Sequence, residues 1–255
     1  MGEYRSMADP RVIKVAVGIP LKGHTCPRAY NDRMLMAFCM GEKEAEQRIN
    51  KEPVLYEFNW FFTGEIFVPF ARENLADLAL RYGCDYLFMV DDDMLAPFDL
   101  FYQLVRHDKD IVAALAFTRN PPHNPVIYTT RQGWDAVARS RYYAKEYVIN
   151  YPRNALVECD AVGFGAVLIK TELFKKMSKP WFMSSDACGE DVLFCTKAKE
   201  AGFRVYMDTT QKLGHISDSI IVTEEYSDNF NKLSESDRED KYGKYTRFES
   251  LEKVR

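Results

Sequence analysis

Three adjacent aspartates, Asp91, Asp92 and Asp93, follow the apolar run "YLFMV". Neighbouring like charges repel, so their place after a predicted buried strand calls for a compensating partner. Mg²⁺ and Mn²⁺ prefer carboxylate oxygens, and in an extended segment Asp91 and Asp93 point the same way. The alternative is an acidic cap on a helix at "APFDLF", since a helix N-terminus favours negative charge by about 0.3–1 kcal/mol. The first interpretation predicts a metal site, and the second predicts a solvated turn.

A second pair of carboxylates occurs in "CGEDVLFC". Gly189 suits a helix N-cap, which would place Glu190 and Asp191 in the first turn, where the helix dipole favours ionised side chains. Favourable capping alone explains such a pair. An ionised carboxylate is also the group that removes a proton from an attacking hydroxyl. Adjacency leaves open which of the two would be the better base.

Three further polar residues could join such a site. His215, in "LGHIS" after the last predicted strand, could complete the coordination of a metal, although a lone histidine is more often structural or exposed. Arg72 and Asn74 fall in the first turns of a predicted helix and could reach a phosphate or a base edge. The alternative for both is a solvated helix face.

The composition limits the classes of partner. The 255 residues, 47% of them hydrophobic, can bury one large core. A formal net charge of −4 gives no general attraction to nucleic acid or anionic lipid, so a phosphate-bearing ligand would need a bound cation or a focused basic group. No signal peptide and no transmembrane-length apolar run is found, which predicts a soluble, cytoplasmic protein. Six cysteines without any C-x-x-C pair predict reduced thiols and no zinc site.

The elements that must position these residues alternate between strands and helices. Such alternation over about the first 117 residues predicts an α/β fold with a mainly parallel sheet covered on both faces. Ligands of such sheets bind beyond the carboxyl ends of the strands, where the aspartates fall. Strands are predicted at 11–20, 53–62, 84–90, 110–117, 155–170 and 203–208, and helices at 28–48, 68–83, 96–107 and 189–202.

Two segments differ from this pattern. Residues 118–155 are rich in Pro, Asn, Arg and Tyr, which predicts an irregular insert with a hairpin that could serve as a substrate-facing lid. Residues 218–255 are strongly charged and are predicted to form a tail with little core.

Within 155–170, Gly163 and Gly165 indicate a bulge or a close backbone approach. The P-loop, dinucleotide, zincin and serine-hydrolase motifs are absent from the sequence.

The order of four motifs resembles a known family. "ARENLADLALRYGCDYLFMVDDDM", "CDAVGFGAVLIKTELF", "PWF" and "GEDVLFCTKAKEAGFRVYMDTTQKLGHIS" follow one another as in nucleotide-sugar-dependent glycosyltransferases of the Rossmann-like GT-A fold, close to the family-2 type of bacteria and viruses. The match covers most of residues 12–217. The resemblance implies one catalytic domain over 1–217, with a nucleotide-sugar-binding half at 12–117, the insert at 118–155 and an acceptor and catalytic half at 156–217.

The resemblance also implies a role for particular residues. Asp91 and Asp93 would form the DxD pair, with Asp93 and His215 as ligands of Mn²⁺ or Mg²⁺ and Asp91 on the metal or the ribose. Asp191 would be the catalytic base of an inverting transfer, with Glu190 beside it. Further residues would contact the nucleoside-diphosphate sugar, namely Pro20, Arg72, Asn74 and Asp92, and Trp181 would lie near the carbohydrate or other hydroxyl acceptor.

Some alternatives stay open at this point. The triplet allows Asp92 with Asp93 to serve the metal, and retaining enzymes of this fold also use a histidine ligand, so inversion rests on "GEDV". A nucleotidyltransferase would show a Gly-rich basic loop after the first strand, where "GIPLKGHTCPRAY" offers Lys22, Arg28 and only Gly23. A third class is a binding module for nucleotides or carbohydrates that has the fold but does not catalyse.

Overall fold

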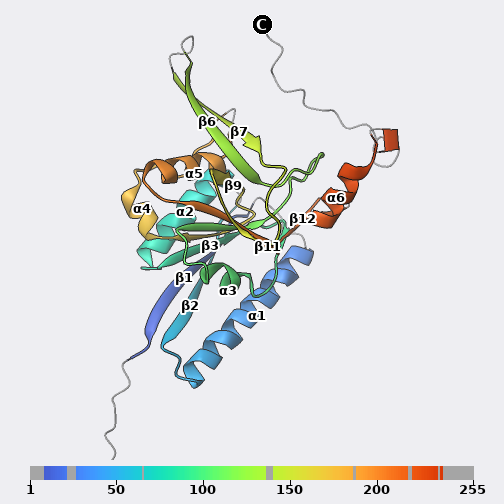
Figure 1. Cartoon of the computed structure of the whole chain (residues 1–255). Coiled ribbons are helices and arrows are strands. Elements are labelled where there is room, and N and C mark those ends of the chain that lie inside the picture. The colour runs from blue at the N-terminus through green and yellow to red at the C-terminus, as the bar shows by residue number, and fades with distance from the viewer. Residues whose placement is uncertain are drawn as a thin grey trace, which may run out of the picture.

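The centre of the molecule is a seven-stranded sheet with helices on both faces (Figure 1). The computed structural model describes residues 9–21, 27–64, 66–135, 140–185, 188–217, 220–234 and 236–237. The strand order is β2-β1-β3-β10-β5-β11-β8, in which β10 and β8 run antiparallel to their neighbours and the other five strands run parallel to one another. The predicted α/β class with a mostly parallel sheet is confirmed. The strands are β1 (Arg11–Ile19), β2 (Val54–Phe62), β3 (Tyr86–Val90), β5 (Ile111–Leu115), β8 (Leu156–Cys159), β10 (Ala166–Lys170) and β11 (Val205–Lys212).

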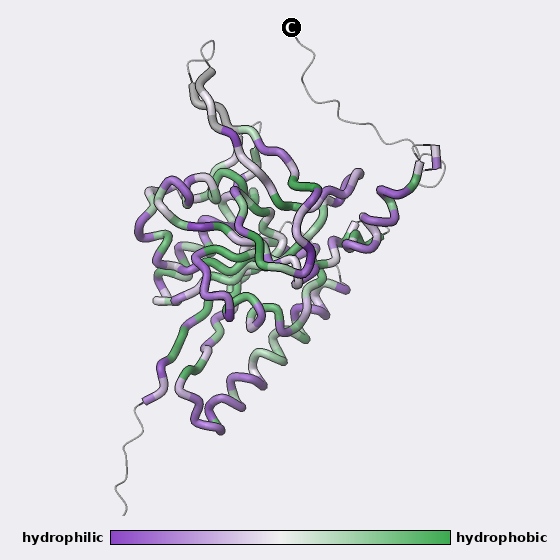
Figure 2. Tube along the Cα trace, viewed as in Figure 1, coloured by the Kyte–Doolittle hydropathy of each residue, from purple (hydrophilic) through white to green (hydrophobic). Residues whose placement is uncertain are grey.

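The strands build two cores because successive side chains point to opposite faces of the sheet. In β3, Phe88 and Val90 join the core on one face, and Leu87 and Met89 join the core on the other. Figure 2 shows hydrophobic segments gathered in the middle of the molecule. The first core lies under α1 (Pro27–Ile49) and α3 (Leu100–Val105), and the second lies under α2 (Val68–Arg81), α4 (Glu172–Lys176) and α5 (Glu190–Glu200). No helix in the described ranges is long and apolar enough to cross a membrane.

Helix α1 packs on the sheet through Met36 and Met40, which are buried, while Leu35 is 50% exposed. Arg33 is 5% exposed and shares their face, because residues three or four positions apart lie on one side of a helix. A buried arginine therefore stands in a row of apolar residues.

A small second sheet joins two distant parts of the chain. Its order is β13-β12-β4, with β4 (Met94–Leu95) directly after the aspartates, β12 (Gly214–Ile216) and β13 (Ile221–Val222). The segment from residue 218 was predicted as a charged tail with little core. Its first part instead contains β13 and α6 (Glu224–Lys232), in which Val222 and Phe230 are at most 1% exposed. This part packs against the rest of the molecule.

The insert forms the predicted hairpin. Strands β6 (Ile127–Asp135) and β7 (Ser140–Tyr147) pair antiparallel, and β6 also pairs with β9 (Ala161–Val162). Figure 1 shows the hairpin projecting from the body of the molecule. Its base therefore belongs to the folded unit while its far end extends away from it.

Candidate active site

The carboxyl ends of the parallel strands border a cavity of about 520 Å³, a size typical of small-molecule sites. Strand β1 leads to Pro20, β3 to Asp91 and β5 to Phe117, and all three residues line the cavity. Because β10 runs in the opposite direction, its beginning lies at the same edge, and the amide N–H of Asp91 donates to the carbonyl of Gly165 at 2.9 Å. The cavity is therefore where the parallel sheet predicted a ligand site.

Gly163 makes one wall of this cavity close-packed. A Cβ atom at this position would lie 2.7 Å from Cβ of Val126. No residue with a side chain fits without a shift of the backbone. The close approach predicted from the glycines is confirmed here.

The three aspartates lie in a turn and not in an extended strand. The amide of Met94 donates to the carbonyl of Asp91 at 3.3 Å, and Asp91, Asp92 and Asp93 all line the cavity. The following helix begins only at Leu100, and its N-cap residue is Asp99. The interpretation of the triplet as a helix cap is therefore wrong. The assumption that the three aspartates lie in an extended segment with alternating side chains is wrong as well.

Arg33 of α1 holds this turn in place. Its Nη2 donates to the backbone carbonyls of Asp91 at 3.0 Å and Met94 at 2.5 Å. Its Nη1 donates to Asp32, whose carboxylate also accepts the amide of Ala96 at 2.8 Å. Sequence reasoning missed Arg33. The available signal was a charged residue at helical spacing among buried positions.

Arg72 joins Asp91 to Glu190 across the cavity. Its Nη2 donates to both carboxylate oxygens of Asp91 at 2.9 and 3.1 Å, and its Nε donates to Glu190 at 3.0 Å. The guanidinium also lies over the ring of Phe164, at 5.5 Å from the centroid. Arg72 is 3% exposed, and within the described residues its Nη1 has no hydrogen-bond partner. Nη1 of Arg72 is therefore a buried hydrogen-bond donor, without a partner in the described residues, on a side chain that lines the cavity.

Burial raises the pKa of Asp91 to about 7, and the charges of Asp93 and Glu190 add to this effect against the pull of Arg72. Among the described residues that line the cavity are five carboxylates, from residues 91–93 and 190–191, and two guanidinium groups, from Arg72 and Arg119. Together these groups carry an excess of negative charge. A bound cation would relieve it.

Asp93 and His215 are brought together by the pairing of β12 with β4. His215 lies opposite Met94 in this ladder, and the amide of Ile216 donates to the carbonyl of Asp93 at 2.9 Å. Nε2 of His215 lies 3.4 Å from Oδ2 of Asp93. Burial alone would favour neutral side chains, but the contact with His215 and with nearby Arg119 lowers the pKa of Asp93, and the bonds to Asp93 and to a backbone carbonyl raise the pKa of His215.

This pair fits a divalent cation. Nδ1 of His215 lies 2.7 Å from the carbonyl of Phe117, a bond that fixes the ring with Nε2 toward Asp93, as is usual for metal-binding histidines. Carboxylate oxygens suit Mg²⁺ and Mn²⁺, and an imidazole nitrogen adds a ligand typical of transition metals. Within the described ranges, no group of three His, Cys, Asp or Glu side chains is arranged to hold a metal. Further ligand positions would therefore fall to phosphate oxygens and water.

Asp191 lies in the first turn of α5, and Gly189 is the N-cap residue as predicted. Oδ1 of Asp191 accepts a hydrogen bond from the amide of Val192 at 2.7 Å. Burial raises its pKa, the charge of Glu190 adds to the rise, and Lys145 of β7 opposes it. A carboxylate with a raised pKa is a stronger base once ionised. Because Glu190 is engaged by Arg72, Asp191 is the better placed of the two for proton transfer.

Two of the predicted site residues are not brought to the cavity. Asn74 is exposed on α2 and does not line it. Trp181 is 3% exposed, packs against Phe174 with ring centroids 5.0 Å apart, and donates its indole N–H to the carbonyl of Met177 at 3.1 Å. Its ring is therefore part of the hydrophobic core and has no exposed face for an acceptor.

Residues 22–26, which include Lys22, Gly23 and Cys26 of the loop after the first strand, lie outside the described residues. Arg28 is exposed on α1. The five cysteines that the structure describes are free thiols.

Comparisons with known proteins support the fold. No family model matches the sequence, and no curated protein matches it. The structure resembles that of A197 from STIV, with a TM-score of 0.54 and 18% identity over 84% of this chain and 92% of that one. This similarity shows a shared fold.

Two other solved structures are less similar. GalNAc-T7 with UDP, GalNAc and Mn²⁺ has a TM-score of 0.44 and 14% identity over 80% of this chain and 44% of its own. A UDP-glucose pyrophosphorylase has a TM-score of 0.46 and 10% identity over 80% of this chain and 93% of its own. With TM-scores below 0.5, neither likeness assigns an activity to this chain.

Proposed function

We propose that the protein is a glycosyltransferase that moves a sugar from a nucleoside-diphosphate sugar to an acceptor hydroxyl, with Mn²⁺ or Mg²⁺ as cofactor and inversion at the anomeric carbon. One observation carries the proposal. A single cavity contains the Asp93–His215 pair, which suits a divalent cation, and the partly buried carboxylate of Asp191, which suits a base.

The donor substrate explains the charges of the cavity. A diphosphate is anionic and would be repelled by five carboxylates, so it needs a cation between itself and the protein. Asp93 and Nε2 of His215 would hold this ion, and a bound divalent cation neutralises the charge that develops on a departing diphosphate. Asp91, held by Arg72, would face the ribose, and Pro20 and Asp92 would line the nucleotide subsite.

Asp191 would act on the acceptor. It accepts the proton of the hydroxyl while the hydroxyl oxygen forms a bond to the anomeric carbon, and the bond from that carbon to the diphosphate breaks. In-line attack from the side away from the diphosphate inverts the configuration. The product stereochemistry can be read by NMR.

The first test is a thermal-stability screen of the protein with Mn²⁺ and a panel of UDP-, GDP- and dTDP-sugars, because a ligand that binds only the folded state raises the Tm. The stabilising donor is then incubated with hydroxyl acceptors, and nucleoside diphosphate release is followed. Release of pyrophosphate from a nucleoside triphosphate and a sugar phosphate would instead identify a nucleotidyltransferase. Binding without turnover of any kind would identify a binding module.

The metal assignment has its own test. Asp93→Ala is expected to abolish the Mn²⁺-dependent part of nucleoside diphosphate binding, measured by calorimetric titration. Asp99→Ala is the matched control, since Asp99 lies at the N-cap position of α3 outside the cavity and its carboxylate accepts a hydrogen bond from Gln103. Unchanged Mn²⁺-dependent binding by the Asp93 variant would overturn the assignment.

A further inference from the structure

Arg119, at the start of the insert, forms an ion pair with Asp93, whose carboxylate is a proposed ligand of the metal. Its guanidinium Nη2 contacts Oδ2 of Asp93, the same oxygen that lies 3.4 Å from Nε2 of His215. The side chain of Arg119 is 42% exposed and lines the cavity. A cation that binds between Asp93 and His215 must therefore compete with Arg119.

The backbone that carries Arg119 is fixed by local hydrogen bonds. The amide of Thr118 donates to the carbonyl of Asn124 at 2.9 Å, and the hydroxyl of Thr118 accepts the amide of Asn124 at 2.9 Å. His123 closes the loop, with Nδ1 at 3.1 Å from the carbonyl of Thr118. Arg119 can therefore change partner by side-chain rotation while the loop stays in place.

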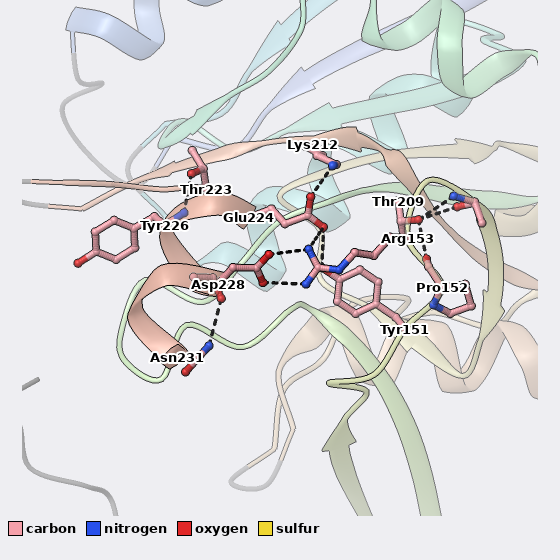
Figure 3. Close-up of polar contacts among 12 residues, drawn as sticks. Tyr151, Pro152, Arg153, Thr209, Lys212, Thr223, Glu224, Tyr226, Asp228 and Asn231 are labelled. Carbon is pink, nitrogen blue, oxygen red and sulfur yellow. Dashed lines mark hydrogen bonds and ion pairs between the residues drawn. The ribbon is translucent and has the colours of Figure 1, made fainter. Parts of the chain in front are cut away.

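Helix α6 holds this loop from outside. Ser227 donates its hydroxyl to the carbonyl of His123 at 2.8 Å, and the ring of His123, which is 2% exposed, packs on Phe230 with centroids 4.9 Å apart. The helix in turn is fixed by Arg153, which donates to both oxygens of Asp228 at 2.7 Å and lies 3.2 Å from Glu224 (Figure 3). The backbone position of Arg119 is therefore fixed by contacts of its loop with α6.

The two guanidinium groups of the cavity differ in their freedom to move. Arg72 is 3% exposed and bonded to Asp91 and Glu190, so its displacement would leave buried carboxylates without a partner. Arg119 is partly exposed, and its pair with Asp93 is weaker for that reason. A guanidinium is also well suited to bind two oxygens of a phosphate.

We propose that Arg119 exchanges partners when the donor binds. Without donor, Arg119 neutralises Asp93; when the cation and the diphosphate enter, Asp93 passes to the cation and Arg119 to a phosphate oxygen. This inference rests on the proposed function and adds a residue to the donor site. It predicts opposite effects of one substitution on two ligands, because Arg119 competes with the cation and assists the diphosphate.

The test measures both ligands on Arg119→Met. Binding of Mn²⁺ alone, followed by the loss of the free-ion EPR signal, should become about threefold tighter. Binding of UDP or GDP in saturating Mn²⁺, measured by calorimetry, should weaken on the order of tenfold. Arg119→Lys should weaken nucleotide binding less than Arg119→Met does, since it keeps the charge and loses the paired geometry.

Arg131→Met is the matched control, because Arg131 is exposed on the hairpin and pairs with Glu146. It should leave both affinities unchanged. If Arg119→Met weakens both ligands, or leaves either affinity unchanged, the exchange is disproved. If the wild-type protein binds no nucleotide with Mn²⁺, it is the proposed function itself that fails, so the two failures can be told apart.

Discussion

Asp91 and Asp93 are two positions apart in the chain, yet they have different partners. Asp91 is paired with Arg72, whereas Asp93 faces His215 and Arg119. A triplet of like charges is tolerated because each of these two members meets a cation from a different element. The sequence left open whether Asp91 or Asp92 serves the metal together with Asp93. Asp93 belongs to both pairs, and we propose it with His215 as the direct metal ligands.

The role of Asp191 can be separated from donor binding. Asp191→Asn is expected to lower the rate of transfer on the order of a hundredfold or more, because the amide cannot accept the proton. The affinity for nucleoside diphosphate with Mn²⁺ should stay the same. Single-turnover transfer and calorimetry on the same preparation measure the two quantities, and a variant that loses affinity while transfer persists would remove Asp191 from the role of base.

Lys145 should lower the pH at which the proposed base ionises. Burial raises the pKa of Asp191, and the positive charge of Lys145 opposes the rise. The transfer rate should climb with pH as Asp191 loses its proton. Lys145→Met removes the opposing charge, so the acid limb of the pH–rate profile should move to higher pH, by up to about one unit.

The control for this profile is Lys43→Met, since Lys43 pairs with Glu46 on α1, away from the cavity. Added salt should shrink the difference between wild type and Lys145→Met, because it screens partly exposed charges. A shift toward lower pH would contradict the assignment of Asp191 as the titrating base.

At the scale of single residues, all five carboxylates among the described lining residues of the cavity were singled out in the sequence, whereas of its two arginines only Arg72 was. Asp91, Asp93 and Asp191 were recognisable because they follow or begin predicted elements. Arg119 was not, since its partner Asp93 is 26 residues away in the chain and no local pattern encodes the contact. Trp181 was assigned to the acceptor by resemblance, but its burial depends on packing against Phe174, which spacing does not reveal.

At the scale of elements, α1 stabilises the aspartate turn through one side chain. Arg33→Met would leave the carbonyl of Met94 without its guanidinium donor and the carbonyl of Asp91 with the amide of Met94 alone, which should lower the free energy of unfolding by about 2–4 kcal/mol. Mn²⁺-dependent nucleotide binding should fall as well, because the turn loses its support. Urea unfolding measures the first effect and calorimetry the second.

Arg48→Met is the control on the same helix. Arg48 makes an exposed pair with Glu44 one turn away, so its loss should cost no more than about 0.5 kcal/mol. Equal destabilisation by the two variants would show that Arg33 has no special role in the turn.

The pairing of β12 with β4 shows why elements of this size escape prediction. Strand β4 has two residues and β12 has three, too few for a hydrophobic period to appear. The long elements, such as α2 with Pro69 in its first turn and Gly83 at a φ of 64° beyond its end, were predicted with nearly correct bounds. The proposed site, however, depends on the short strands β4 and β12, because their pairing brings His215 to Asp93.

At the scale of the whole molecule, Arg72 connects the two halves of the chain. Its partner Glu190 is 118 residues away, on the helix that also carries Asp191. Arg72→Met would leave two largely buried carboxylates unpaired, and the free energy of unfolding should fall by about 3–5 kcal/mol. Urea unfolding should show the loss.

Arg81→Met, at the exposed end of the same helix, should stay within about 0.5 kcal/mol of the wild type. A loss at Arg72 as small as this would mean that the halves are held together by the sheet alone.

The pairing of β12 with β4 also has a consequence for synthesis on the ribosome. His215 reaches Asp93 only through this ladder, so the proposed metal-binding pair cannot form while a nascent chain ends before β12. A domain generally folds as a unit, and β11 of the central sheet directly precedes β12 in the chain, so the sheet and this pair are completed at the same stage. Tight cation binding therefore has to await the emergence of the last strands.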